Sequence, residues 1–170
     1  MRFIHLYTTL ILLLAFMSQS MGQDYKNAVR LSYGTYAGIS YKRMFNQEQG
    51  VMANIQYGEN SFILSGLRVF DTPAFPETSS KWFISYGYGV HLAYRTKIKS
   101  RNLFRPFAPA IVHEGDFISP GFDGYFGLEY RFLKYPFTVS ADLMPNFEFF
   151  GPGYFRVNLN TVSVTAAFVF

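Results

Sequence analysis

Charged side chains recur at every second position in parts of this sequence, and the chemistry open to them is ion pairing. Glu129 and Arg131 stand two residues apart, and Asp142 follows in the next segment. Residues two apart in a β-strand share one face, so these groups of opposite charge are predicted to lie close together. Charges removed from water are costly unless they pair, so the pattern predicts a salt-bridge network.

Catalytic and metal chemistry have weaker support. Beyond residue 22 the histidines are His91 and His113, and neither has a neighbouring serine in a recognisable nucleophile motif. His113 lies beside Glu114 and Asp116, a set more typical of a solvated turn than of a base or a metal site. The chain has no cysteine, which excludes disulfides, thiolate metal sites and cysteine nucleophiles. We expect no catalysis, no metal and no cofactor.

The elements that must position these residues are β-strands. Apolar and polar residues alternate with the strand period in about eight segments. In the clearest segment Trp82, Tyr88 and Tyr94 share one face, while His91 and Arg95 share the other. The predicted strands cover residues 27–34, 39–45, 51–57, 61–70, 82–95, 121–132, 137–146 and 155–170, with a bulge near Asn160.

The predicted connections alternate between two sides. One side holds 35–38, 58–60, the long irregular segment 96–120, and 147–155. The other side holds 46–50, 71–80 and 133–136. The strand that ends the chain is apolar at Val162, Val164, Ala166, Phe168 and Phe170. It resembles the terminal signal of bacterial outer-membrane β-barrels, in which the last residue is aromatic.

The first residues predict export. Met1-Arg2, the apolar run 10–17 and small residues up to Gly22 have the order of a secretory signal peptide. The apolar run is too short to span a membrane as a helix. We expect residues 1–22 to be removed and residues 23–170 to form one domain.

Composition and alternation together predict a membrane barrel. Aromatic residues make up 20% of the chain and charged residues 15%, whereas soluble proteins average about 25% charged. Strands with an apolar outer face must close on themselves in lipid. The predicted fold is all-β: an eight-stranded antiparallel up-and-down transmembrane β-barrel in the outer membrane, with both termini in the periplasm.

The lumen of such a barrel is just wide enough for side chains to fill. By alternation, nine ionisable side chains are predicted to point inward: Arg30, Lys42, Arg68, His91, Arg95, Asp123, Glu129, Arg131 and Asp142. We expect a salt-bridged plug, with a small pore or a ligand-binding pocket as the alternative.

Several short segments carry a family resemblance. They are 31–34 with 38–42, then 86–91, 127–132 and 142–145, and in this order the chain resembles the small outer-membrane β-barrel proteins of Bacteroidetes. The resemblance implies an eight-stranded outer-membrane barrel and no particular reaction. Small barrels that deacylate or acylate lipid A leave a lipid-modifying enzyme as a second alternative. A soluble lipocalin-like barrel is disfavoured, because its usual Gly-x-Trp is missing near the start.

Basic residues gather at the start of the long outer segment. Lys97, Lys99, Arg101 and Arg105 are predicted to contact lipopolysaccharide phosphates, and a merely solvated loop is an equal alternative. The expected partners are outer-membrane lipids and the barrel-assembly machinery during insertion. We expect a monomer and no nucleic acid.

Overall fold

The computed structural model describes residues 25–100, 111–149, 155–159 and 161–170. Within them the strands are β1 (Asn27–Gly34), β2 (Ala37–Met44), β3 (Gln49–Gly58), β4 (Ser61–Phe75), β5 (Ser79–Ser100), β6 (Ile111–Arg131), β7 (Phe137–Leu143), β8 (Asn146–Phe149), β9 (Phe155–Asn158) and β10 (Val162–Val169). The predicted signal peptide, residues 1–22, lies outside the described residues.

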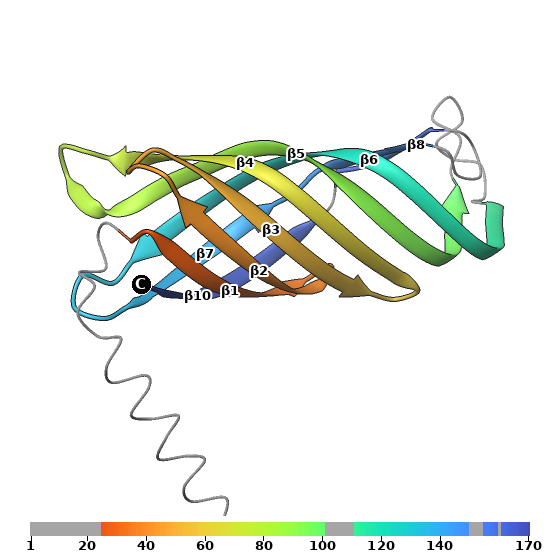
Figure 1. The fold of residues 1–170 in the computed structure, drawn as a ribbon, viewed down its shortest axis with the longest axis horizontal. Helices are drawn as coiled ribbons and strands as arrows, with labels where there is room; N and C mark the ends of the chain where they lie inside the picture. Colours follow the sequence, from red (N-terminus) through yellow and green to blue (C-terminus); the bar gives the residue numbers. More distant parts are fainter. Residues whose placement is uncertain (1–24, 101–110, 150–154, 160) are drawn as a thin grey trace, which may run out of the picture.

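The strands form one closed antiparallel sheet (Figure 1). Successive strands pair from β1 to β7, and β10 pairs with both β7 and β1, which closes the barrel. β7 and β8 pair with β6 in one continuous register, so they act as a single barrel strand. β9 and β10 act as another, because they pair with β8 and β7. The described residues therefore form eight barrel strands, and the predicted eight-stranded antiparallel barrel is confirmed.

The last barrel strand carries an extra residue. Leu143 pairs with Val162, whereas Asn146 pairs with Asn158. The chain therefore advances by one residue more between β9 and β10 than between β7 and β8, which is the signature of a β-bulge. This agrees with the bulge predicted near Asn160, although Asn160 itself is outside the described residues.

Three predicted connections were wrong. In the segment 147–155 the described residues are strand, because β8 continues to Phe149 and β9 begins at Phe155. The segment 71–80 is largely strand, because β4 runs to Phe75 and β5 begins at Ser79. β4 pairs with β3 only as far as Phe70, so Pro73 lies on a free edge, where its missing N–H costs no ladder bond. Pro73 therefore did not end the strand.

The segment 96–120 is also mostly strand in its described part, since β5 reaches Ser100 and β6 begins at Ile111. This end of the β5–β6 hairpin extends past β4, whose last pair with β5 is Ser61 with Arg95. Here the backbone groups of the two strands hydrogen-bond to each other, but the strands do not form part of the barrel wall. Hydrophobic alternation is not required of them, so the sequence pattern did not reveal them.

The turns separate into two sets, as predicted. Those after β2, β4 and β6 lie at the end of the barrel that holds the C terminus, and those after β1 and β3 lie at the opposite end (Figure 1). We call these the terminal end and the far end. Among the described residues, no helix is long and apolar enough to cross a membrane.

The inward and outward faces of β4 are the reverse of the prediction. Ile63, Leu67 and Val69 are buried in the lumen, and Arg68 is exposed on the outer wall. β4 has apolar residues on both faces, so alternation alone could not fix its phase. The observed phase turns Asp71 inward, where it meets Lys42 at 2.7 Å. In the opposite phase that carboxylate would face outward, away from its partner.

Candidate functional site

The barrel interior gathers nearly all the residues that the sequence analysis assigned to it. Eight of those nine side chains are buried there: Arg30, Lys42, His91, Arg95, Asp123, Glu129, Arg131 and Asp142. Arg68 is the exception. The eight side chains fall into three clusters along the barrel, and each cluster is built around one carboxylate that the strands bring into reach of several donors.

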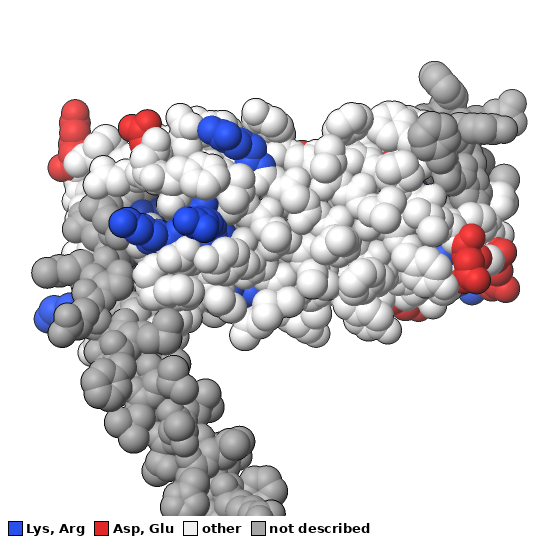
Figure 2. Space-filling model, viewed as in Figure 1, with Lys and Arg blue, Asp and Glu red and all other residues white. Residues whose placement is uncertain are grey.

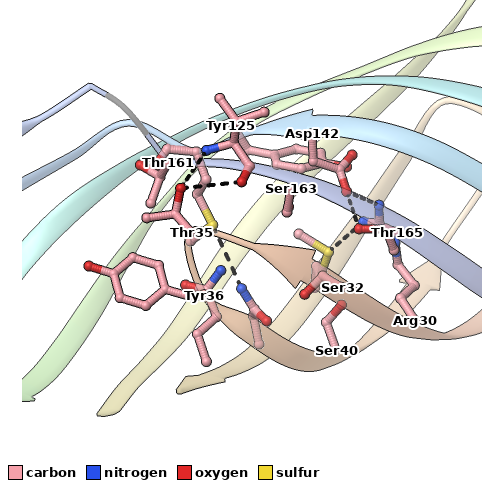
Figure 3. Close-up of a pocket in the computed structure, with 15 residues that line it drawn as sticks. Arg30, Ser32, Thr35, Tyr36, Ser40, Tyr125, Asp142, Thr161, Ser163 and Thr165 are labelled. Carbon is pink, nitrogen blue, oxygen red and sulfur yellow. Dashed lines mark hydrogen bonds and ion pairs between the residues drawn. The ribbon is translucent and has the colours of Figure 1, made fainter. Parts of the chain in front are cut away.

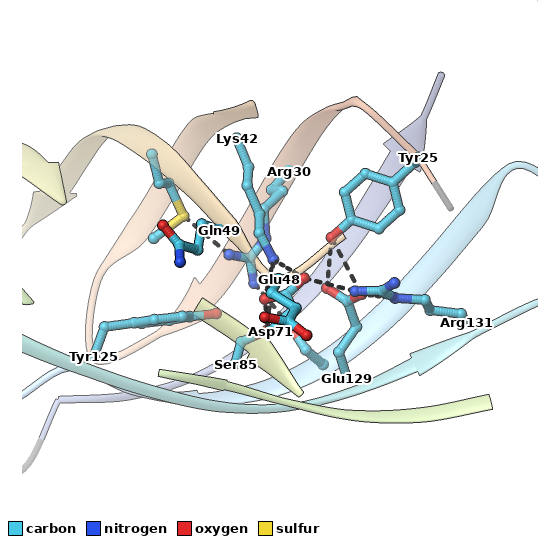
Figure 4. Close-up of polar contacts among 12 residues, drawn as sticks. Tyr25, Arg30, Lys42, Glu48, Gln49, Asp71, Ser85, Tyr125, Glu129 and Arg131 are labelled. Atoms are coloured by element: carbon cyan, nitrogen blue, oxygen red, sulfur yellow. Dashed lines mark hydrogen bonds and ion pairs between the residues drawn. The ribbon is translucent and has the colours of Figure 1, made fainter. Parts of the chain in front are cut away.

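The Asp71 cluster lies nearest the terminal end (Figure 4). The Lys42 ammonium lies 2.7 and 2.8 Å from the two Asp71 carboxylate oxygens. The Arg131 guanidinium bonds to Asp71 at 2.6 Å and to Glu129 at 2.6 Å. Ser85 donates to Asp71 at 2.8 Å. Asp71 therefore accepts from three side chains on three other strands.

Aromatic rings enclose this cluster. The Arg131 guanidinium carbon lies 3.6 Å from the Phe83 ring centroid and 4.7 Å from that of Tyr25. The Tyr25 hydroxyl also lies 3.2 Å from both Glu129 carboxylate oxygens. Stacking on ring faces is favourable for a guanidinium that has left water. Tyr25 precedes β1, so the segment that enters the barrel also covers the charges at this end.

The Asp142 cluster lies between the other two, because Asp142 pairs with Gly127, which stands between Asp123 and Glu129 on β6. Figure 3 shows its side chains. The Arg30 guanidinium bonds to Asp142 at 2.9 Å and to the Ser140 hydroxyl at 3.0 Å. Tyr125 donates to Asp142 at 2.9 Å, and Thr165 donates to it at 2.5 Å. The adjoining cavity has a volume of about 20 Å³, which is room for about one water molecule.

The Glu148 cluster lies toward the far end. Arg95 bonds to Glu148 at 2.5 and 3.2 Å through two nitrogens, and Arg156 bonds to the same carboxylate at 2.5 Å. Beside it, His91 Nδ1 lies 2.7 Å from Asp123 Oδ1, and His91 Nε2 lies 3.9 Å from Glu148 Oε1. Two guanidinium groups and an imidazole thus surround one buried carboxylate.

The interior charges balance. Among the described residues, the buried carboxylates are Asp71, Asp123, Glu129, Asp142 and Glu148. The buried Lys and Arg residues are Arg30, Lys42, Arg95 and Arg131. Arg156, whose side chain is 20% exposed, is the fifth cation. Five cations therefore face five carboxylates when His91 is neutral.

Sequence reasoning missed three charged members of these clusters, and it missed Tyr25. Asp71 and Glu148 fell in predicted connections, and Tyr25 preceded the first predicted strand. Arg156 lay in the last predicted strand, before its predicted bulge, and was not assigned to the lumen. The signal that could have found Asp71 was the unpaired Lys42, which needs a carboxylate at its own depth in the lumen. Glu148 lies two residues after inward-facing Asn146, so a longer predicted strand would have placed the Glu148 side chain inside the barrel.

Ser65, His91 and Asp123 have the residue types of a nucleophilic triad. Ser65 is the cross-strand partner of His91, and Asp123 bonds to the His91 Nδ1 atom. Within the described part of the chain, however, neither the Ser65 hydroxyl nor His91 Nε2 has a hydrogen-bond partner, so the two do not bond to each other. All three side chains are buried, and the cavity beside the Asp142 cluster is not lined by them.

Two glycines make room for the clusters. A Cβ atom on Gly127 would lie 2.5 Å from Asp142 Oδ1 and 2.8 Å from the Tyr125 hydroxyl. A Cβ atom on Gly121 would lie 2.4 Å from His91 Cε1. Both contacts are too close for a real side chain, so the bulky polar groups occupy space that these glycines leave.

Of the residues predicted to contact lipopolysaccharide, Lys97 and Lys99 lie on β5 beyond its last pair with β4. Lys97 pairs with Glu114 at 2.8 Å, and both side chains are well exposed. Their hydrogen bond, with the attraction between the charges, raises the pKa of Lys97 and lowers the pKa of Glu114. The backbone of Lys99 pairs with Val112. Arg101 and Arg105 are outside the described residues.

Comparison with known proteins supports the architecture. The structure is similar to the N-terminal β-barrel domain of OprF from Pseudomonas aeruginosa, with a TM-score of 0.53 and 11% sequence identity. The match covers 85% of this chain and 95% of the OprF domain. It establishes the fold alone. No protein-family model and no curated protein matches the sequence.

Proposed function

We propose that this protein is an integral outer-membrane β-barrel with a filled, salt-bridged lumen, that it has a structural or surface-interaction role, and that it catalyses no reaction. The observation that carries the proposal is the placement of charged and apolar side chains, which is the reverse of that in a soluble protein. The buried charges pair inside the barrel, and many large apolar side chains cover its outside.

The outer wall is suited to lipid. Its exposed apolar side chains come from every part of the barrel, and they include Leu31 at 62%, Tyr57 at 68%, Val90 at 56% and Val164 at 67% exposure. Soluble monomers seldom expose continuous apolar surface on this scale. Figure 2 shows the middle of the visible wall almost free of Lys, Arg, Asp and Glu. A membrane barrel requires such a band between its polar ends.

The lumen is suited to a plug. Each of its three clusters links side chains from several strands, and the cavity at its middle has room for about one water molecule. The ion pairs of these clusters connect strands that are not neighbours in the sheet. We infer that they replace the apolar core of a soluble protein and stabilise the closed barrel.

Location and partners follow from this proposal. With both termini in the periplasm, the far end faces the outside of the cell, and Lys97 and Lys99 lie at the level of lipopolysaccharide phosphates. The terminal strand is then the segment read by the barrel-assembly machinery. We propose a monomeric barrel of the kind found in Bacteroidetes, in contact with outer-membrane lipids.

Fractionation of cells tests the proposal. The protein should partition with outer membranes, require detergent for extraction, and migrate faster on gels when unheated, because a closed barrel resists unfolding by dodecyl sulfate. Recovery from the soluble periplasm without detergent would contradict it. Disruption of the gene, assayed for envelope integrity and secretion, then addresses its role.

A lipid-modifying enzyme is the second candidate, and the set of Ser65, His91 and Asp123 favours it. The test is covalent labelling by a fluorophosphonate, which reacts with activated serines. We expect no labelling above that of Ser65→Ala, because the buried Ser65 hydroxyl donates no hydrogen bond to a base that could activate it. Labelling that is abolished in Ser65→Ala would establish a nucleophile and displace the non-catalytic role.

A further inference from the structure

The outer wall carries two arginines that the lumen clusters do not use. Arg43 on β2 and Arg68 on β4 are both cross-strand partners of Val51 on β3. All three residues are exposed on the outer face. The arginine Cα atoms are therefore separated by two strand spacings, about 10 Å. Both side chains border the same patch of wall above Val51.

Among the described residues, no carboxylate neutralises these two charges. In the part of the chain that is described, neither guanidinium lies within salt-bridge distance of Asp or Glu. Arg68 instead donates to the neutral amide oxygen of Gln49 at 2.8 Å. Its guanidinium carbon lies 6.0 Å from the Phe45 ring centroid and 5.8 Å from that of Phe70. The cation is held in place and remains unpaired.

The position of Arg68 on the barrel indicates its surroundings in a membrane. Gln49 begins β3, so the Arg68 side chain reaches toward the terminal end. Figure 2 shows most of the visible Lys and Arg side chains toward the end of the wall that holds the C terminus. A cation on a lipid-facing wall is costly at the membrane midplane and costs little at the interface. Arginines beside aromatic rings are therefore expected at headgroup level.

We propose that Arg43 and Arg68 form a binding site for the phosphate of a phospholipid headgroup, in the leaflet at the terminal end of the barrel. Guanidinium groups bind phosphate oxygens through paired N–H donors, and two of them flank one patch. The rings of Phe45 and Phe70 lie beside the cation, where they can contact the glycerol and upper acyl chains. This site rests on the proposed membrane location and adds a specific lipid contact to it.

Phosphatidylglycerol is the probe for the test. The full mature chain is reconstituted into nanodiscs of neutral lipid, and its affinity for fluorescent phosphatidylglycerol is measured for wild type and for Arg43→Gln/Arg68→Gln. We expect about a fivefold loss for each arginine and about 25-fold for the pair. The matched control is Lys81→Gln/Lys134→Gln, which also removes two exposed charges from the terminal end of the barrel. It should change the affinity by less than about twofold.

An unchanged affinity in the arginine double variant, or an equal loss in the lysine control, would overturn the site. Arg43→Lys/Arg68→Lys keeps both charges and should recover part of the affinity, because lysine lacks the paired donors. Excess inorganic phosphate should not displace the lipid, and displacement would indicate a free-anion site instead. Heat-modifiable migration of every variant tests the barrel itself, so failure of the proposed membrane location is distinguished from failure of this site.

Discussion

Arg131 joins the two carboxylates nearest the terminal end of the lumen, because one guanidinium bonds to both Glu129 and Asp71. Sequence alternation was enough to place Arg131 and Glu129 inside, since both have the parity of Tyr125 in a clearly alternating strand. It could not find Asp71, because two prolines follow that residue and suggested a loop. At the scale of single residues, alternation gives the face of a side chain, but its partners depend on the register between strands.

Replacing Arg131 with Ala should lower the free energy of unfolding by about 3–5 kcal/mol, because two buried carboxylates would lose a shared partner. Urea unfolding in lipid vesicles measures this. Lys134→Ala is the control, since Lys134 is exposed in the turn between β6 and β7, and it should change the free energy by less than about 1 kcal/mol. Equal losses for the two variants would argue that the lumen charges are solvated.

Gly127→Ala should destabilise the barrel by about 1–3 kcal/mol, because its methyl group would displace the Asp142 carboxylate and the Tyr125 hydroxyl. The same unfolding measurement applies. Gly66→Ala is matched to it, because a Cβ atom on Gly66 would meet nothing within 4 Å. If both glycines tolerate alanine equally, the Asp142 cluster is looser than the distances indicate.

The strands differ in how well the sequence predicts which of their faces points into the barrel. β2, β6 and β7 have polar residues on one face and apolar residues on the other, so their phase could be predicted. β4 has Ile63, Leu67 and Val69 on the face opposite Phe62, Leu64 and Phe70, so its phase is set by pairing with β3 and β5. The far part of the β5–β6 hairpin lines no barrel wall, so no alternation marked it.

The residue that follows β10 completes the pairing with β1 that closes the barrel. Phe170 exchanges backbone hydrogen bonds with Asn27 at 2.8 and 2.9 Å, at the start of β1. Removing Phe170, or replacing it with Ser, should therefore impair insertion, because the change affects both the closing strand and the aromatic end of the chain. The fraction that is heat-modifiable in outer membranes measures the effect.

Phe132→Ser is the control for this prediction. Phe132 is an exposed aromatic residue at the same end of the barrel, but it follows β6 and takes no part in closing the sheet. Its replacement should leave insertion close to that of the wild type. Normal insertion of the Phe170 variants would show that the likeness to the terminal signal of outer-membrane barrels is superficial.

The whole molecule balances its charges inside and presents an apolar wall outside, and the central claim is that the interior is a plug. An aqueous pore would screen the interior charges and leave a continuous path for ions, whereas the described lumen is crossed by three clusters. Single-channel recording of the wild-type protein in planar bilayers tests this most directly. A plug predicts negligible conductance. Large, stable single-channel currents, together with unchanged stability of Arg131→Ala, would contradict the plug and establish a pore.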